Sequence, residues 1–250
     1  MAQVQEAGGR RREPSAVSWK RVNHEWTRID TIGAGTTEKM ARKLALNSCP
    51  FVFIRGFRMK LLCVYCSSSD RLDPKYAAAA EQLGRELVAR NWGLVYGGGK
   101  TGLMGAVARG TKAAGGRVVG VIPEFMKARE LAFDEADELV TVVTMRERKL
   151  LMETRADAFV CLPGGFGTLE EIMEILTLRQ LDVVKKPCVF FNQDGFYDDL
   201  IRLFERMLAE KFFKPSNMEL FRVANSVPDI FAEIEIAREA KVESKWFQTR

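Results

Sequence analysis

The sequence predicts an α/β fold, a single domain with a Rossmann-like, doubly wound parallel sheet. From residue 60 onward, short runs that are apolar throughout alternate with helical stretches, as in parallel sheets covered on both faces. Two glycine-rich turns follow such runs directly. With 250 residues and a hydrophobic content of 47%, the chain can bury one sizeable core.

Four strands and three helices are expected in the first part of the domain. The strands are the apolar runs Lys60–Cys66, Gly93–Tyr96, Arg117–Ile122 and Leu139–Thr144. The helices are Pro74–Arg90, which has proline near its first turn and many alanines, Gly102–Ala114 and Arg146–Arg155. The stretch after Pro123 has no clear periodicity.

The second part continues the alternation. Its strands are Ala158–Leu162 and Pro187–Phe191, and its helices are Thr168–Leu181, Tyr197–Lys211 and Pro228–Ala240. Ligands of such sheets bind beyond the carboxyl ends of the strands. Because the glycine turns after Tyr96 and Leu162 both lie at such ends, we expect the site at that edge of the sheet.

Charge is unevenly distributed along the chain. Residues 1–58 contain 11 Lys and Arg against 5 Asp and Glu, whereas the other residues contain 27 against 28. The basic character therefore belongs to the N-terminal part, and nucleic-acid binding by the domain is not expected. The predicted organisation is a basic, flexible appendage over residues 1–58, the Rossmann-like domain over 59–240 and a tail over 241–250. The appendage also fits a transit peptide or residues upstream of a start at Met59.

The composition argues for a cytoplasmic protein. No apolar run approaches the roughly 20 residues that span a bilayer, so no membrane association is expected. Five cysteines, an odd number, fit a reducing compartment better than a disulfide framework. Cys63 and Cys66 lie within one predicted strand, where residues three apart face opposite sides, so we expect buried thiols rather than a redox pair.

The most informative stretch is Pro163–Glu171, a glycine turn that leaves a strand and enters a helix with two adjacent carboxylates. Glycines let the backbone approach a ligand closely, and the positive end of a helix dipole suits a phosphate. Glu170 and Glu171, one turn further on, can face whatever is attached to that phosphate. A phosphorylated small molecule is the first hypothesis.

Other chemistries are disfavoured. The turn Gly97–Gly102 is not a P-loop, because Leu94 stands where that motif requires glycine, and it fits a dinucleotide fingerprint poorly because it follows the second strand.

His24, outside the domain, is the single histidine of the sequence, which excludes Ser–His and Cys–His schemes and histidine metal sites from the domain. We expect neither a metal nor a cofactor.

A cationic cluster, Met145–Lys149, precedes the glycine turn by one helix and one strand. Such a run is usually a solvated helix face. Cations at a helix start oppose the dipole, however, so they suggest an anionic ligand or a carboxylate partner, for which Glu171 is the candidate.

Together these segments resemble the Lonely Guy (LOG) family of cytokinin riboside 5′-monophosphate phosphoribohydrolases, formerly labelled lysine decarboxylases. The resemblance covers roughly Met59 to Ala240 and rests on Met-x-x-Arg-Lys at Met145–Lys149 and Pro-Gly-Gly-x-Gly-Thr-x-x-Glu at Pro163–Glu171. It implies hydrolysis of the N-glycosidic bond of a nucleoside 5′-monophosphate, giving free base and ribose 5-phosphate. Whether the base is an isopentenyladenine type, plain adenine or another purine stays open.

The resemblance also implies roles for individual residues and a homodimer. Arg148 and Glu171 become the catalytic pair. The positions that contact the nucleotide become Glu130, Lys149, Gly164, Gly165, Gly167, Thr168, Glu170 and Thr177. The alternative is a protein on the same fold that carries a nucleotide or molybdenum cofactor without catalysis, and a structural scaffold is a third hypothesis.

Overall fold

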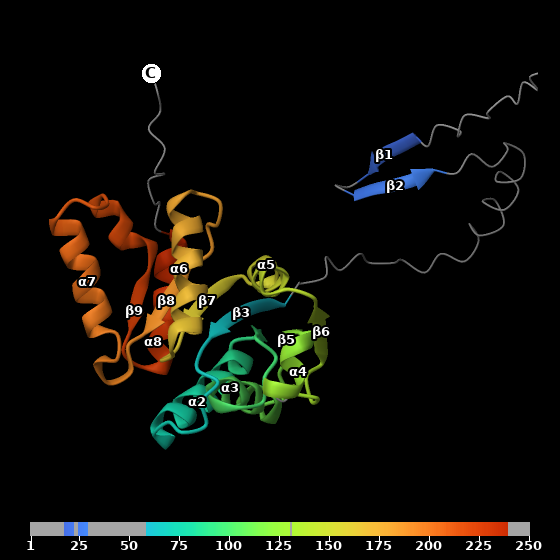
Figure 1. Ribbon diagram of the computed structural model, residues 1–250, viewed down its shortest axis with the longest axis horizontal. Coiled ribbons are helices and arrows are strands. Elements are labelled where there is room, and N and C mark those ends of the chain that lie inside the picture. The colour runs from blue at the N-terminus through green and yellow to red at the C-terminus, as the bar shows by residue number, and fades with distance from the viewer. Residues whose placement is uncertain (1–17, 23–24, 30–58, 131, 240–250) are drawn as a thin grey trace, which may run out of the picture. The chain divides into compact units, whose positions relative to one another are not determined.

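The computed structural model describes residues 18–22, 25–29, 59–130 and 132–239 (Figure 1). The chain divides into two units, Met1–Gly56 and Phe57–Arg250. In the first unit, β1 (Ser18–Val22) and β2 (Glu25–Ile29) pair antiparallel, which the sequence does not predict. The predictions for the rest of residues 1–58 and for the tail 241–250 lie outside the described residues.

The second unit contains a seven-stranded parallel sheet in the order β6-β5-β4-β3-β7-β8-β9. Its strands are β3 (Lys60–Tyr65), β4 (Trp92–Tyr96), β5 (Val118–Pro123), β6 (Glu138–Val142), β7 (Ala158–Cys161), β8 (Cys188–Phe191) and β9 (Arg222–Ala224). The chain adds strands in one direction from β3 to β6, and then in the other direction from β7 to β9. The predicted doubly wound sheet is confirmed, and its topological switch lies between β3 and β7.

Helices cover both faces of this sheet. One core contains side chains from α2 (Pro74–Ala89), α3 (Gly102–Ala113) and α8 (Val227–Glu239), and the other contains side chains from α5 (Met145–Arg155), α6 (Phe166–Gln180) and α7 (Asp198–Ala209). Figure 1 shows α2 beside α3 at one end of the sheet and α6 between α5 and α7. Cys63 in β3 belongs to the second core and Cys66, directly after β3, to the first, so the two thiols lie on opposite faces of the sheet, as predicted.

Local signals explain where the helices begin. The Asp73 side chain accepts a hydrogen bond from the Lys75 N–H at the start of α2, and Pro74 occupies the first helical turn. At α5, Thr144 and Glu147 form a capping box, in which each side chain accepts from the other's backbone N–H. This capping box stabilises a helix start that the cations of the cluster would otherwise disfavour.

The structure differs from the sequence prediction in two short elements, α4 and β9, and in the start of α6. Helix α4 (Glu124–Glu130) directly follows Pro123, where no periodic element is expected, and β9 adds a seventh strand of three residues. Helix α6 begins at Phe166, two residues before the predicted start, because the glycine turn itself enters the helix. Within the described ranges, no helix has both the length and the apolar character needed to cross a membrane.

Candidate active site

A cavity of about 330 Å³ lies at the carboxyl ends of β3, β4 and β7. It therefore occupies the topological switch point, where ligands of doubly wound sheets bind. Loops after the three strands, together with α5, α6 and neighbouring methionines, form its walls. The lining residues are Val64, Cys66, Ser67, Ser68, Ser69, Gly97, Met104, Met126, Met145, Arg148, Met152, Gly165, Gly167, Thr168, Glu170 and Glu171.

The loop Ser67–Ser69, which leaves β3, lines the cavity and is hydrogen-bonded to its neighbours through the backbone. The Ser67 N–H donates to the Pro163 carbonyl at 3.4 Å, and the Leu103 N–H donates to the Ser67 carbonyl at 2.9 Å. Gly102 has φ +54°, and a Cβ there would lie 2.5 to 2.8 Å from this loop's backbone. The sequence gives no direct signal for the loop, since hydroxyl side chains at a strand end are common in turns.

Arg148 projects from α5 to the carboxyl ends of β4 and β5 and is 5% exposed. Its Nε donates to the Val121 carbonyl at 3.2 Å, and its Nη2 donates to the Gly97 carbonyl at 3.0 Å. Nη1 lies 3.9 Å from the Met126 Sδ and 4.0 Å from the Met145 Sδ. Main-chain acceptors thus fix the plane of the guanidinium at the floor of the cavity.

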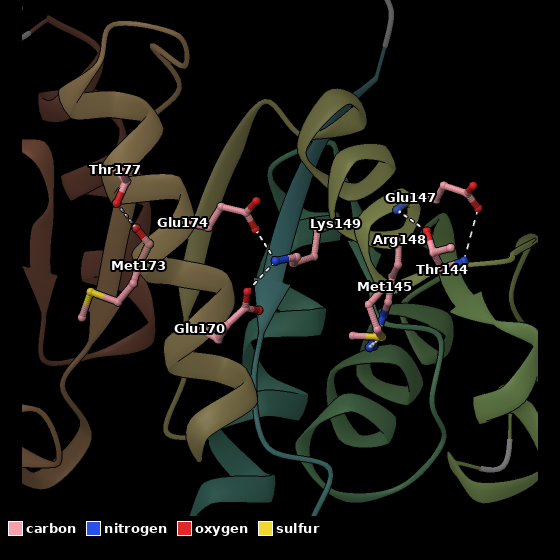
Figure 2. A network of polar contacts seen from close by, with 9 residues as sticks. All are labelled: Thr144, Met145, Glu147, Arg148, Lys149, Glu170, Met173, Glu174 and Thr177. Carbon is pink, nitrogen blue, oxygen red and sulfur yellow. Dashed lines mark hydrogen bonds and ion pairs between the residues drawn. The ribbon is translucent and has the colours of Figure 1, made fainter.

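Lys149, the next residue, points to a different side (Figure 2). Its Nζ lies 2.5 Å from Glu170 Oε1 and 2.7 Å from Glu174 Oε2, one turn apart on α6. Burial lowers the pKa of the Lys149 ammonium, but the hydrogen bonds to the two carboxylates outweigh this effect and raise the pKa overall. Lys149 therefore connects α5 to α6 through two ion pairs.

The glycine turn has two kinds of glycine. A Cβ at Gly164 would lie 2.2 Å from the Thr168 Oγ1, so packing within the turn requires glycine there. A Cβ at Gly165 or Gly167 would meet nothing within 4 Å, and both residues line the cavity. Gly165 is the N-cap of α6, and its φ of −92° is open to any residue. None of the residues that the structure describes requires glycine at these two positions, which leaves the backbone open to a close ligand.

Glu171 lies over the carboxyl end of β3, in the second turn of α6. The pKa of the Cys66 thiol is raised first by burial and then by the negative charge of Glu171, whereas the charge of Arg148 lowers it. The same two charges act in the same directions on Cys63. Glu171 and Arg148 therefore reach the same region from different helices, and both line the cavity.

Not every predicted site residue lines this cavity. Lys149 and Thr177 line a neighbouring hollow together with Glu170, and the Thr177 hydroxyl donates to the Met173 carbonyl at 2.8 Å. Glu130 is the last residue of α4, and its side chain lies outside the described part of the chain. In the described ranges, no group of three or more His, Cys, Asp or Glu residues could hold a metal ion.

Four methionines line the cavity that the sequence prediction does not assign to a ligand: Met104, Met126, Met145 and Met152. Methionine is flexible and polarisable, so it adapts to apolar groups of differing shape. Methionines at helical spacing usually indicate a packed core, which is why sequence alone does not single them out. Their shared place at one cavity follows from the sheet topology.

Comparison with known proteins assigns the chain to a family. A family model described as "possible lysine decarboxylase" matches residues 104–234. The chain is 43% identical over 178 residues to a probable cytokinin riboside 5′-monophosphate phosphoribohydrolase, LOGL9, of Oryza sativa subsp. japonica, with 71% of this chain and 78% of the relative covered. It is 40% identical over 178 residues to the cytokinin riboside 5′-monophosphate phosphoribohydrolase LOG7 of Arabidopsis thaliana, with 71% and 82% covered.

Solved structures share the fold. The molybdenum cofactor carrier protein of Chlamydomonas reinhardtii matches with a TM-score of 0.56 at 21% identity, covering 72% of this chain and 98% of that one. The molybdenum cofactor binding protein of Rippkaea orientalis matches with a TM-score of 0.55 at 20% identity and the same coverage. At these identities the likeness shows the fold alone. The relatives and the family model, by contrast, show that the chain belongs to the Lonely Guy (LOG) family.

Proposed function

We propose that this protein hydrolyses the N-glycosidic bond of a cytokinin riboside 5′-monophosphate or AMP, releasing the free base and ribose 5-phosphate. The observation that carries the proposal is the meeting of Arg148 and Glu171 in one cavity with an open glycine turn. The named activity of the rice and Arabidopsis relatives supports it. The catalytic domain would comprise residues 59–240.

The phosphate would bind at the start of α6. Gly165 and Gly167 present their backbone to the cavity without a Cβ, and Thr168 adds a hydroxyl. The positive end of the helix dipole favours a dianion there. Held by a group remote from the reacting bond, the ribose is fixed with its anomeric carbon toward Glu171.

Glu171 would carry the chemistry. As the C1′–N bond breaks, positive charge builds on the ribose, and a carboxylate beside C1′ stabilises it. The hydroxyl of a water molecule ends on C1′, and the proton of that water ends on the departing base. Glu171 would orient this water, and Arg148, whose guanidinium donates to two main-chain carbonyls, would provide a positive charge near the base and the carboxylate.

The methionine wall suits a purine with a variable substituent. Met104, Met126 and Met145, which form this wall, offer polarisable, adaptable surface to the cavity. We therefore expect turnover of both AMP and the isopentenyl nucleotide, with their ratio set by this wall.

We further propose a cytoplasmic homodimer that does not bind nucleic acid. The surface around α5 and α6 exposes large apolar side chains, with Phe166 at 94%, Leu150 at 62% and Val183 at 66%. An apolar groove of about 190 Å³ between α6, α7 and the 3-10 turn η2 (Pro215–Leu220) adds to it. Apolar surface of this kind marks association sites. The molar mass in solution tests the dimer, and a monomer with full activity would contradict it.

The decisive experiment follows free base release. Purified protein is incubated with AMP and with isopentenyladenosine 5′-monophosphate, and the products are separated by chromatography. We expect equal amounts of base and ribose 5-phosphate, loss of release with Glu171→Ala, and no change with Glu205→Gln, an exposed glutamate on α7. Undiminished release by Glu171→Ala would refute the mechanism, and a co-purified pterin without any base release would favour the carrier function.

A further inference from the structure

Tyr197 carries a buried hydroxyl that the proposed mechanism does not use. The residue is 2% exposed and lies just before α7, 35 residues after Leu162. Its hydroxyl donates to the Leu162 carbonyl at 2.7 Å, and the Cys161 Sγ lies 3.1 Å from the Tyr197 hydroxyl oxygen. Burying a hydroxyl is costly unless it is hydrogen-bonded, so a phenylalanine would pack there at lower cost if the contact had no use.

A network holds the tyrosine in this position. The Tyr197 N–H donates to the Asn192 Oδ1 at 2.7 Å, and the Asn192 Nδ2 donates to the Asp198 Oδ1 at 2.8 Å. Asn192 is itself anchored, because its N–H donates to the Ala224 carbonyl at 2.8 Å. The Tyr197 ring packs edge to face on Phe190, with centroids 5.1 Å apart. Both ends of the tyrosine are thus fixed, and the hydroxyl is aimed at one carbonyl.

That carbonyl is at the root of the glycine turn. Strand β7 ends at Cys161, and Leu162 is the last residue before Pro163 and the glycines. The Leu162 N–H still donates to the Tyr65 carbonyl at 2.9 Å, whereas its own carbonyl points to Tyr197. Pro163 has no N–H to donate. The hydroxyl of Tyr197 therefore fixes the peptide from which the turn departs.

We propose that Tyr197 is a positioning residue for the phosphate-binding turn: by holding the Leu162 carbonyl, it sets where the backbone of Gly165–Thr168 faces the ligand. The inference rests on the proposed function of that turn. Burial raises the pKa of the Tyr197 phenol, so it remains a donor throughout the neutral range. Tyr197 would thus affect phosphate binding without touching the substrate.

The test is Tyr197→Phe, which removes one oxygen and keeps the ring. We expect KM for the nucleotide and the inhibition constant of ribose 5-phosphate to rise roughly 3- to 10-fold, the range of one neutral hydrogen bond, with kcat little changed. Tyr76→Phe, on α2 and against Phe196, is the matched control and leaves both constants unchanged. Asp198→Ala removes an exposed carboxylate that accepts a hydrogen bond from Asn192. We expect it to raise KM and the inhibition constant too, but by less than Tyr197→Phe.

A purely structural role would lower the melting temperature of Tyr197→Phe and leave KM and the inhibition constant unchanged, and that result would overturn the proposal. Calorimetric binding of ribose 5-phosphate separates this outcome from failure of the proposed function. If the wild type binds ribose 5-phosphate but releases no base, the hydrolase proposal fails, and the affinity of Tyr197→Phe still decides the role of Tyr197.

Discussion

The guanidinium of Arg148 occupies the space that a side chain at Gly97 would need. A Cβ built on Gly97 would lie 1.9 Å from the Arg148 Nη2, the same atom that donates to the Gly97 carbonyl. The backbone of Gly97 is not in the left-handed region, so the turn conformation does not require glycine there. The space occupied by the Arg148 side chain does. Gly97 is therefore part of the site because, having no side chain, it leaves room for the Arg148 guanidinium.

Gly97→Ala should displace Arg148 and, if Arg148 has the proposed catalytic role, lower kcat/KM by about 100-fold, the scale of a misplaced catalytic group. Base release from AMP measures the effect. A double-mutant cycle provides the control: in an Arg148→Ala background, Gly97→Ala should cost little more, because the clash is with the guanidinium. Full additivity of the two changes would contradict this explanation.

Gly165→Ala and Gly167→Ala should raise KM for the nucleotide without destabilising the fold. In the part of the chain that the structure describes, no atom lies within 4 Å of either added Cβ. Gly167 lies in α6, so alanine there should stabilise the protein by up to about 1 kcal/mol. Thermal melts and steady-state kinetics measure the two effects separately. Gly164→Ala, which clashes with Thr168, is expected to lose both stability and activity. A lower melting temperature with unchanged KM at Gly165 would argue against a close ligand.

Glu174→Gln should remove one of the two ion pairs between α5 and α6. Lys149 would then pair with Glu170 alone, a residue that lines the cavity. Both carboxylates are about half exposed, so the loss in unfolding free energy should stay below about 1 kcal/mol and kcat/KM should fall less than about tenfold. Added salt should reduce the activity of the wild type toward that of the variant. If the difference persists at high salt, the effect is not that of an ion pair.

Acid should destabilise the fold through Asp137 and Glu138. Hydrogen bonding to Arg155 lowers the pKa of Glu138, and hydrogen bonding to Lys112 and to the Val118 N–H lowers that of Asp137. In the unfolded chain both groups titrate near pH 4, so the unfolded state takes up protons first as the pH falls. Their contribution is fully present above the pKa values of the unfolded chain and is lost as the pH falls through the lower pKa values of the folded protein.

Urea unfolding at several pH values tests this. The free energy of unfolding should fall with pH less steeply in a variant with Asp137→Asn and Glu138→Gln than in the wild type. Equal slopes would mean that other carboxylates dominate acid unfolding.

Four cysteines should resist alkylation in the native protein. Burial raises the pKa of the thiols of Cys63, Cys66 and Cys161, and it raises the pKa of Cys188 to about 12. Since the thiolate is the reactive species, iodoacetamide at pH 8 should leave these residues unmodified until the protein is unfolded. Peptide mass spectrometry before and after denaturant measures the labelling. Rapid native labelling of Cys63 would contradict its burial between the sheet and its helices.

Most of the sheet could be predicted because its strands are apolar on both faces and are separated by helices that have clear starts. The short elements could not be predicted from the sequence. Helix α4 follows Pro123, a residue that usually ends an element, and β9 has three residues, too few to show a period. Both depend on tertiary packing, which local sequence does not encode.

The candidate site, like the fold, could be predicted only in part. The motifs mark Arg148, Glu171 and the glycine turn because their chemistry depends on residue type. The hydrogen-bond partners of Arg148 are the main-chain carbonyls of Val121 and Gly97. Every residue has such a carbonyl, so a sequence motif does not identify these two as the partners, although the space taken by the guanidinium requires glycine at position 97. Likewise, spacing along the chain does not place Lys149 between two turns of α6.

The switch between β3 and β7 has a consequence for folding of the chain. The lining residues Ser67–Ser69 follow the first strand of the sheet, and the lining residues of the glycine turn follow a strand that comes about 95 residues later in the sequence. Strands β3 to β6 are consecutive in sequence and adjacent in the sheet, but they supply only part of the cavity lining. The cavity is complete only after the β7 segment pairs with β3, so we expect activity to appear late in folding.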